Sequence, residues 1–511
     1  MEADVSAGRR SRLLLRLLPG GSVRRLAGLS LAWAGASWAQ AQETGPRNCF
    51  WQAQGDPVLL NVAYPDFAAS YWLSAYTLPA GAELELRGRY PHARYMSFNL
   101  YDAGLAPVDG LADLGIAADG GSVNPFLAGA RRDLEQRDYT VRVVPAPAPA
   151  LRAANTLYQT LDGTLTLAPV TGSETASPLG VMIYRIYLPD RGRSLTGDVP
   201  LPTVAVKLAN GQRIEGPAAC ELLGTHLPDP VSPLLHALTP PASPTPGQNA
   251  ADPVHWIKFT NLVRSAGVEP PAAAAPFFPP GSGGFFSNSD NAYVRAAWNT
   301  YFGENLLLFG RAPSFPDTRG GAAVMAASQV RYWSICQNDS TTTRTVSCLA
   351  DDEVPLDAQG HYLVLIAGAD ARPANATTDC GVAYLPAGPN PRGFLLLRNM
   401  LPEAGFAQSV QAVPDADVET PEQAMGAYLP MGKHLSRAQF ESLGCPVQAK
   451  AVLALLEASP VAVPPALVAS VAGGSSGGAA SLSALIVLAF AARARRAQSP
   501  QRLTSNSSRE Q

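Results

Sequence analysis

An internal duplication constrains the fold of this chain more than any other feature. The stretch from Gly88 to Asp119 recurs, almost element for element, from Gly310 to Asp357. Both copies contain Gly-Arg-x-Pro, then Arg-Tyr-x-Ser, then Leu-Ala-Asp with a second Asp further on. The anchors are Gly88, Arg89, Pro91, Arg94, Tyr95, Ser97, Leu111, Ala112, Asp113 and Asp119, matched by Gly310, Arg311, Pro313, Arg331, Tyr332, Ser334, Leu349, Ala350, Asp351 and Asp357. A repeat this long predicts a duplicated domain, because solenoid repeats run roughly 20 to 50 residues.

The similarity extends on both sides of these anchors. Upstream, the run from Tyr71 to Pro91 aligns without a gap with the run that starts at Tyr293. Downstream, each copy closes on an apolar segment, Gly180 to Pro189 and Gly393 to Pro402. We therefore expect the two copies to share one fold.

The segments within each copy have the period of β-strands. From Arg94 to Tyr101 apolar and polar residues alternate, which is typical of a strand with one greasy and one polar face. The apolar set is Met96, Phe98 and Leu100, and the polar set is Tyr95, Ser97, Asn99 and Tyr101. Many short strands with Gly and Pro turns favour antiparallel sandwiches. The predicted fold is mainly β, with tandem duplicated antiparallel β-sandwich modules, a Pro-rich connector and a small helical C-terminal extension.

Composition shifts along the chain divide it into seven parts. They are a signal peptide (1–41), module 1 (48–226), a Pro/Ala-rich connector (227–284), module 2 (285–414), a helical extension (415–460), a linker (461–478) and a hydrophobic tail with a basic stop (479–511). One short helix, Pro253 to Ser265, is predicted inside the connector because Trp256, Phe259 and Leu262 would share a face. In the extension, Ser436 and Gln439 form a capping-box pattern.

The first part has the layout of an export signal. A basic region precedes an apolar run, Leu26 to Trp38, and a small-residue site, Ala39-Gln40-Ala41. We expect the export machinery and signal peptidase to act here, with cleavage before Gln42. The Arg24-Arg25 pair leaves the twin-arginine route open, although general secretion is favoured.

The C-terminal end has a second three-part layout. A spacer, Gly473 to Gly478, precedes an apolar stretch, Ala479 to Ala492, and a basic stop that begins at Arg493. This tail resembles the bacterial GlyGly sorting signal that the intramembrane protease rhombosortase cuts, which implies a C-terminal processing protease as a partner. The alternative is permanent inner-membrane anchoring by the same segment, although its apolar run is short of the roughly 20 residues that span a bilayer. Either way, the modules are expected in the periplasm, on the outer surface or outside the cell.

Six cysteines, all in the part predicted to be exported, favour disulfides. Cys336 and Cys348 are equidistant from Thr342, so a hairpin centred there pairs them. The pairing of Cys49, Cys220, Cys380 and Cys445 stays open. Zinc is the disfavoured alternative, because the cysteines lack the close spacing of metal-ligand pairs.

Composition and motifs disfavour several classes of function. The net charge is −3 and only four lysines are present, without a basic stripe, so nucleic acid is not an expected partner. The Gly-x-Ser-x-Gly match at Gly473 lies in the spacer and lacks the strand and helix that a nucleophile elbow needs. No cofactor or metal is predicted; calcium at Asp109, Asp113, Asp119 and Asn124 is a minor alternative, because their spacing matches no known loop.

The duplicated Arg, Tyr, Ser and Asp residues are the candidate site. Arg185 and Arg398 lie inside apolar strands, where an unpaired guanidinium is costly, so each is expected to meet a carboxylate. Asp113 and Asp351 are the predicted partners, with Asp66 and Asp290 as further candidates. The predicted ligand-binding residues are Tyr95, Ser97, Tyr101, Arg185, Tyr332, Ser334 and Arg398. The competing interpretation is structural, a buried ion pair that sets sheet register.

Two of these motifs carry a family resemblance. Asp290-Asn291-x-Tyr293 with Arg-Tyr-Trp-Ser, and Arg-Tyr-Met-Ser-Phe-Asn-Leu-Tyr-Asp in the first copy, resemble exported bacterial proteins that pair two related β-sandwich domains of unknown function. The resemblance implies fold and export. For function we expect an envelope or surface protein that binds a small or amphipathic ligand on or between the modules. The alternative is a secreted enzyme acting on an extracellular compound through an Arg/Tyr/Asp site.

Overall fold

The structure is a computed structural model. It describes residues 47–55, 61, 64–101, 107–161, 180–225, 251–260, 286–339, 344–415 and 421–457. The predicted signal peptide (1–41), linker (461–478) and sorting signal (479–511) lie outside these residues, so processing at both ends stays a prediction. No helix in the described ranges is long and apolar enough to cross a membrane.

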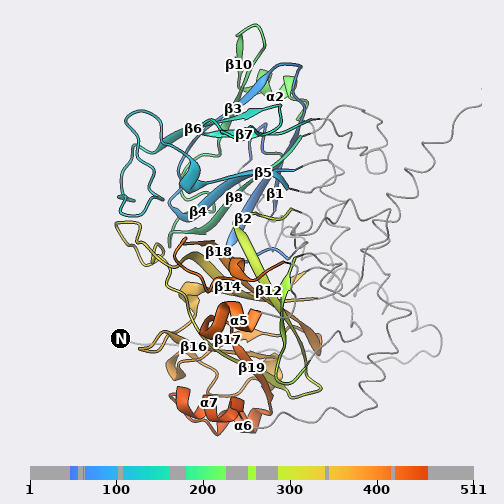
Figure 1. The fold of residues 1–511 in the computed structure, drawn as a ribbon, viewed down its shortest axis with the longest axis vertical. Coiled ribbons are helices and arrows are strands. Elements are labelled where there is room, and N and C mark those ends of the chain that lie inside the picture. Colours follow the sequence, from blue (N-terminus) through green and yellow to red (C-terminus); the bar gives the residue numbers. More distant parts are fainter. Residues whose placement is uncertain are drawn as a thin grey trace, which may run out of the picture. The chain divides into compact units, whose positions relative to one another are not determined.

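The first module is a sandwich of two five-stranded sheets (Figure 1). One sheet has the order β1 (Ala53–Gly55), β2 (Ala69–Tyr76), β8 (Gly180–Pro189), β4 (Ala93–Tyr101), β5 (Pro107–Ala112). The other has the order β10 (Arg213–Glu215), β9 (Thr203–Lys207), β3 (Glu83–Arg89), β6 (Asp138–Val144), β7 (Thr156–Tyr158). Helix α2 (Pro217–Leu222) and the turn η1 (Asp113–Gly115) complete it. Apolar residues of both sheets, including Trp72, Phe98 and Val141, form the core between them.

The second module repeats this plan. One sheet has the order β11 (Trp256–Phe259), β12 (Asn291–Asn299), β18 (Arg392–Pro402), β14 (Val330–Asn338), β15 (Thr345–Ala350). The other has the order β17 (Ala383–Pro386), β16 (His361–Ala367), β13 (Asn305–Arg311), β19 (Met431–Leu435). Short 3-10 turns and helices join or cover them: η3 (Asp351–Glu353), η4 (Ala369–Ala371), η5 (Thr378–Cys380), η6 (Val410–Ala412), α5 (Pro421–Met425), η7 (Gly426–Tyr428), α6 (Arg437–Glu441) and α7 (Ala449–Glu457).

The five-stranded sheets of β1 and β11 have the same strand order, element for element along the chain. In both modules the short strand β7 or β17 is the parallel neighbour of β6 or β16. The structure therefore confirms the mainly β fold with tandem duplicated sandwich modules.

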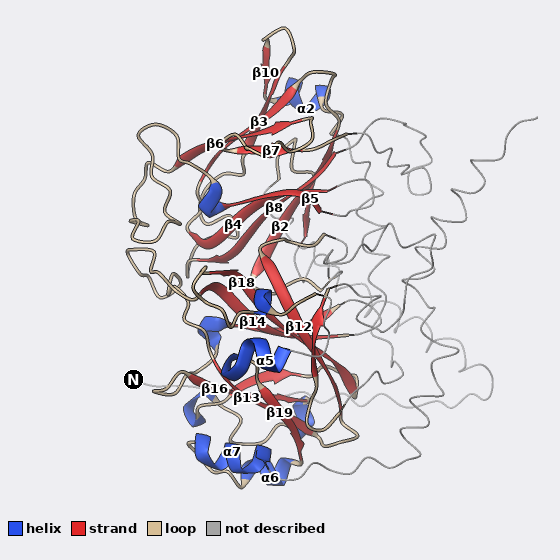
Figure 2. Cartoon of the chain, in the orientation of Figure 1, coloured by secondary structure: helices blue, strands red, loops and turns tan. Residues whose placement is uncertain are grey.

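The two modules differ in what covers the outer face of the sheet that contains β3 or β13. Strand β3 alternates buried leucines with half-buried or exposed charged residues, whereas β13 is buried along almost its whole length. Leu307 and Phe309 of β13 pack against Phe440 and Val452 of the helical extension. Figure 2 shows α6 and α7 near the strands of this sheet. The extra leucines of β13 thus reflect a strand covered on both faces.

Two secondary-structure predictions need correction. Residues 256–259, predicted to be helical, form strand β11, which pairs antiparallel with β12. Apolar spacing alone cannot distinguish a short buried strand from a helical turn. Here the segment forms a strand because it pairs with the edge of β12. The extension also contributes strand β19, which pairs with β13. The capping box at Ser436 is confirmed, because its side chain accepts a hydrogen bond from the Gln439 amide at the start of α6.

The structure has three disulfides and no free cysteine in its described ranges. The predicted pair Cys336–Cys348 is confirmed: the two residues face each other across β14 and β15 with their Cα atoms 4.0 Å apart. The other bonds join Cys49 to Cys220 and Cys380 to Cys445. Disulfides persist in oxidising compartments, so the bonds support an exported location.

We expect peptide mapping of unreduced protein to return these three cystine pairs. Replacing both Cys336 and Cys348 by Ala should lower the free energy of unfolding by about 2–4 kcal/mol, because the bond restricts the unfolded chain. Urea unfolding measures the loss. A free thiol at any of the six positions, or an unchanged midpoint in the double variant, would contradict the assignment.

Candidate functional site

The candidate site lies between the two modules, where the polar faces of their five-stranded sheets are buried. We call this the inter-module layer; its residues belong to β2, β4 and β8 of the first module and to β12, β14 and β18 of the second. All nine residues of β4, and all nine of β14, are buried. Met96, Phe98 and Leu100 enter the first core as predicted. The opposite, polar face meets the second module instead of solvent.

The structure brings all the predicted ligand-binding residues into this layer. None of their side chains exceeds 3% exposure. The residues are Tyr95, Ser97, Tyr101, Arg185, Tyr332, Ser334 and Arg398. The prediction that these residues contact a ligand is untested.

The predicted carboxylates take part in a reciprocal exchange between the modules. Arg94 of the first module pairs with Asp351 of the second, and Arg331 of the second pairs with Asp113 of the first. The second pair has an N–O distance of 3.1 Å. Both aspartates are fully buried. Asp113 and Asp351 were expected to pair with Arg185 and Arg398, so that assignment is wrong.

Each of these aspartates also binds the backbone of its own module. The Met96 amide donates to Asp113 at 2.9 Å, and the Trp333 amide donates to Asp351 at 3.2 Å. Burial raises the pKa of both carboxyls to about 6, and the neighbouring arginine offsets only part of that effect.

Arg398 meets a carboxylate as predicted, and it is that of Asp66. The Arg398 Nη1 atom pairs with Asp66 Oδ2 across the layer. The Tyr332 hydroxyl donates to the same carboxylate at 3.0 Å, and the Ser334 hydroxyl donates at 2.8 Å. The Asp66 side chain is therefore held by a cation and two hydroxyls, all from the second module.

The duplication places Asn288 where Asp66 stands in the other half. Asp66 Oδ1 accepts a hydrogen bond from the Ala68 amide, and Asn288 Oδ1 accepts one from the Asp290 amide. Asn288 also donates to the Tyr95 hydroxyl at 2.9 Å, as the counterpart of the contact between Asp66 and Tyr332. An amide thus stands where the other half has a carboxylate, and the second copy of the polar cluster lacks that charge.

Arg185, the counterpart of Arg398, is held by neutral groups. It donates to the side-chain oxygen of Asn99, to the Tyr101 hydroxyl at 2.5 Å and to the Phe286 carbonyl at 2.6 Å. Within the described ranges no carboxylate oxygen lies within ion-pair distance of this guanidinium. The expectation that Arg185 contacts a carboxylate is therefore wrong.

Asp290 is a buried carboxyl whose pKa responds to the charge of Arg185, but its own hydrogen bond is to another residue. Its Oδ2 atom accepts a hydrogen bond from the Tyr95 hydroxyl at 2.5 Å. Burial raises the pKa of Asp290, while that hydrogen bond and the charge of Arg185 act to lower it. The guanidinium and carboxylate thus influence each other without contact.

Two aromatic rings lie close to the Arg185 guanidinium, and an apolar cluster lies beside it on β8. The guanidinium carbon lies 5.7 Å from the ring centres of both Tyr71 and Tyr101. Val181 and Ile183, which precede Arg185 on β8, pack with Tyr101 in an apolar cluster. Leu73 and Phe286, both half-buried, border the same cluster. One cation therefore stands at the end of an apolar strip.

An insertion of the second module clamps the first beside this layer. The segment between β13 and β14 reaches the loop at Gly129 and Ala130, where backbone hydrogen bonds join both residues to Met325. The Met325 side chain is buried in the core of the first module. The modules therefore share core residues as well as charges.

Sequence reasoning left Arg94, Arg331, Asn99 and Asn288 out of the candidate site. The identical Arg-Tyr-x-Ser motifs were a usable signal for the first two, because both copies keep a costly cation next to a buried tyrosine. No comparable signal marks Asn99 or Asn288. Asn99 contacts Arg185, and Asn288 contacts Tyr95 of the other module, and neither contact can be read from local sequence spacing.

One group of potential metal ligands occurs within the described ranges, namely Asp66, Cys336 and Cys348. Both cysteines are joined in a disulfide, so neither offers the thiolate that a metal requires. This group therefore does not form a metal site.

The fold and the layer define a disulfide-bonded protein of two fused β-sandwich modules. No protein-family profile and no curated protein matches the chain. An uncharacterized protein of known structure from Burkholderia cenocepacia aligns over 74% of this chain and 79% of its own, with 11% identity and a TM-score of 0.39. A protein from Vibrio parahaemolyticus aligns over 73% and 90%, with 9% identity and a TM-score of 0.34. These similarities assign no function.

We expect Arg94→Met to cost about 3–5 kcal/mol of stability at pH 8, because it leaves Asp351 buried without its cation. Arg131→Met is the matched control, since Arg131 pairs with Asp133 on the surface, where solvent screens the interaction and the loss should be much smaller. Urea unfolding compares the variants. Equal losses in both would show that the exchange is energetically unimportant.

The pH dependence of stability should also change in Arg94→Met. A carboxyl whose pKa is raised on folding contributes stability that is present below its unfolded pKa, near 4, and is lost as pH rises through about 6. Without Arg94 the pKa of Asp351 rises further, so the variant should lose more stability than wild type between pH 5 and pH 8. Parallel stability curves over this range would contradict the expectation.

Proposed function

We propose that this chain is an exported binding protein of the bacterial envelope or cell surface, and that its ligand is a small amphipathic anion held at Arg185 in the inter-module layer. The observation that carries the proposal is the broken symmetry of the two clusters. Arg398 is neutralised by Asp66, whereas Arg185 contacts only neutral oxygens. A buried cation favours a nearby anion, and a ligand carboxylate would supply the charge that Asn288 lacks.

The apolar strip beside Arg185 supports an amphipathic ligand. Val181, Ile183 and Leu73 offer aliphatic surface, and Phe286 and Tyr101 offer rings that also contact each other, with centres 5.7 Å apart. A ligand whose anionic end meets the guanidinium would place its apolar body along this strip. Burial of each methylene contributes about 0.8 kcal/mol, so chain length should govern affinity.

The enzyme alternative rests on Tyr95 and Asp290. Their 2.5 Å hydrogen bond places a phenol next to a carboxyl whose pKa is raised, close to the charge of Arg185. Such a pair could exchange a proton with a bound compound. Turnover of a bound anion that is lost in Asp290→Asn, with binding retained, would favour this alternative.

The test uses straight-chain carboxylates from acetate to decanoate, titrated calorimetrically into the full chain at pH 7. Wild type should bind them with an affinity that rises roughly fourfold per methylene. Arg185→Gln should weaken binding by about tenfold or more, because it removes the cation that holds the carboxylate. Alcohols of matched length should bind weakly to both proteins.

Arg137→Gln is the matched control. Arg137 is equally buried in the first module and donates to the carbonyls of Tyr90, Arg132 and Leu134, which belong to the same module. If Arg137→Gln and Arg185→Gln weaken binding alike, the loss reflects general damage and the proposed site is wrong. The proposal also fails if wild type binds carboxylates and alcohols equally.

A further inference from the structure

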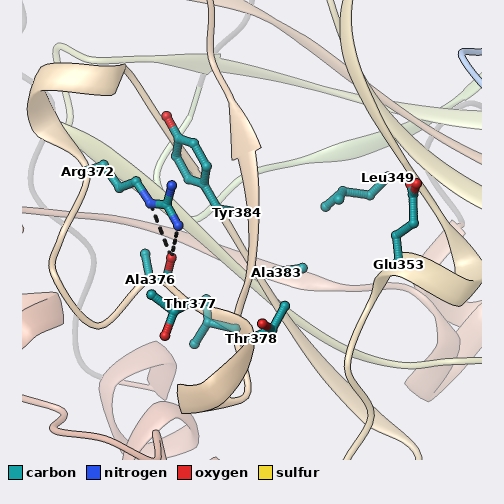
Figure 3. Close-up of a pocket in the computed structure, with 9 residues that line it drawn as sticks. Leu349, Glu353, Arg372, Ala376, Thr377, Thr378, Ala383 and Tyr384 are labelled. Carbon is teal, nitrogen blue, oxygen red and sulfur yellow. Dashed lines mark hydrogen bonds between the residues drawn. The ribbon is translucent and has the colours of Figure 1, made fainter.

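A surface pocket of the second module has features that suggest a binding site of its own. Its volume is about 290 Å³. It lies beside the edge of β17 and the segment before it, with the end of β15 and η3 opposite (Figure 3). The lining residues are Leu349, Glu353, Arg372, Ala376, Thr377, Thr378, Val382, Ala383 and Tyr384.

One wall of the pocket carries a fixed positive charge. The Arg372 guanidinium stacks on the Tyr384 ring, 4.1 Å from its centre. Its Nε and Nη2 atoms donate to the Ala376 carbonyl at 3.2 and 2.6 Å. The Tyr384 hydroxyl donates to the Ala367 carbonyl at 3.0 Å, which holds the ring in place. The arginine is thus oriented by neutral groups.

The opposite wall carries a carboxylate. Figure 3 shows Glu353 across the pocket from Arg372, with Ala383 between them. Glu353 Oε2 accepts a hydrogen bond from the Ala350 amide at 2.9 Å, which fixes the side chain. Arg319, which binds Asp352 at 3.1 Å, lies 3.9 Å from the other oxygen. Leu349, Val382 and Ala383 supply apolar surface between the two charges.

The first module also has an arginine that stacks on a tyrosine, and that arginine binds a carboxylate. There Arg152, in the segment before β7, stacks on Tyr158, and its Nη2 atom donates to Asp109 at 2.5 Å. Asp109 lies on β5 opposite Leu100, and the matching position on β15, opposite Gln337, is Ser347. An arginine next to a tyrosine ring thus occurs in both modules, but the two pairs are not equivalent, because the counterpart of Tyr158 is Pro386, whose carbonyl accepts a hydrogen bond from Ser347 at 2.6 Å.

We propose that this pocket binds a small zwitterion, an amino acid or a short peptide, whose carboxylate meets Arg372 and whose ammonium meets Glu353. The ligand carboxylate would give Arg372 a counter-charge, as Asp109 gives one to Arg152 elsewhere in the protein. Thr377 and Thr378 would add hydroxyls along the rim. The volume is at the lower end of the range for ligand pockets, which suits a dipeptide. This site is independent of the one proposed at Arg185.

The experiment titrates alanyl-alanine into the full chain at pH 7, with two blocked probes. Acetyl-alanyl-alanine lacks the ammonium, and alanyl-alanine amide lacks the carboxylate. Wild type should bind the dipeptide about tenfold more tightly than either blocked form, since each loses a charge-assisted contact. Arg372→Gln should remove the preference over the amide, and Glu353→Gln should remove the preference over the acetylated form.

Arg152→Gln is the matched control, because it also removes an arginine that stacks on a tyrosine, but one that Asp109 already binds. It should leave dipeptide binding unchanged. The proposal is overturned if wild type does not discriminate among the three probes or binds none of them up to about 10 mM, a free energy near −3 kcal/mol. It is also overturned if Arg152→Gln weakens binding as much as Arg372→Gln. Circular dichroism verifies that each variant is folded.

Discussion

The reciprocal exchange of charges between the modules is the interaction on which the rest of the structure depends. Each Arg-Tyr-x-Ser arginine reaches the aspartate that follows the edge strand of the other module, and both aspartates are fully buried. Removing one partner of either pair would leave a buried charge without compensation, at a cost of about 3–5 kcal/mol. The polar strand faces can therefore be interior surfaces, which β-sandwiches more often present to water.

Because the modules are duplicated, residues of one can be compared with the corresponding residues of the other. Where both copies keep a contact, as with the tyrosines that meet Asp66 and Asn288, the simplest explanation is structural. Where one copy has no carboxylate, as at Asn288, the corresponding arginine, Arg185, keeps its position but has no counter-charge in contact. Such differences are more informative than the shared motifs. A buried cation without a paired anion is energetically costly, so its presence calls for an explanation.

The sequence was sufficient for the fold class because strand alternation and repeated anchors depend on local pattern. The Cys336–Cys348 pair followed from hairpin symmetry for the same reason. The predicted residues do lie together in one buried layer, and their role in binding stays a prediction. The partners assigned to Asp113 and Asp351 were wrong, since Arg94 meets Asp351 across two modules and no local spacing encodes that contact. Strand β11 was missed because Trp256 and Phe259 fit a helical face until the edge of β12 is present.

The exchange has the form of an isologous interface, in which one patch meets its own copy about a twofold axis. A single-module ancestor that paired with itself would have had to keep both halves of that patch identical, because one gene specified both. Once the two modules were joined in one chain, each half could change alone. The difference between Asp66 and Asn288, and the insertion that carries Met325 into the neighbouring core, are asymmetries that a dimer of identical modules could not have.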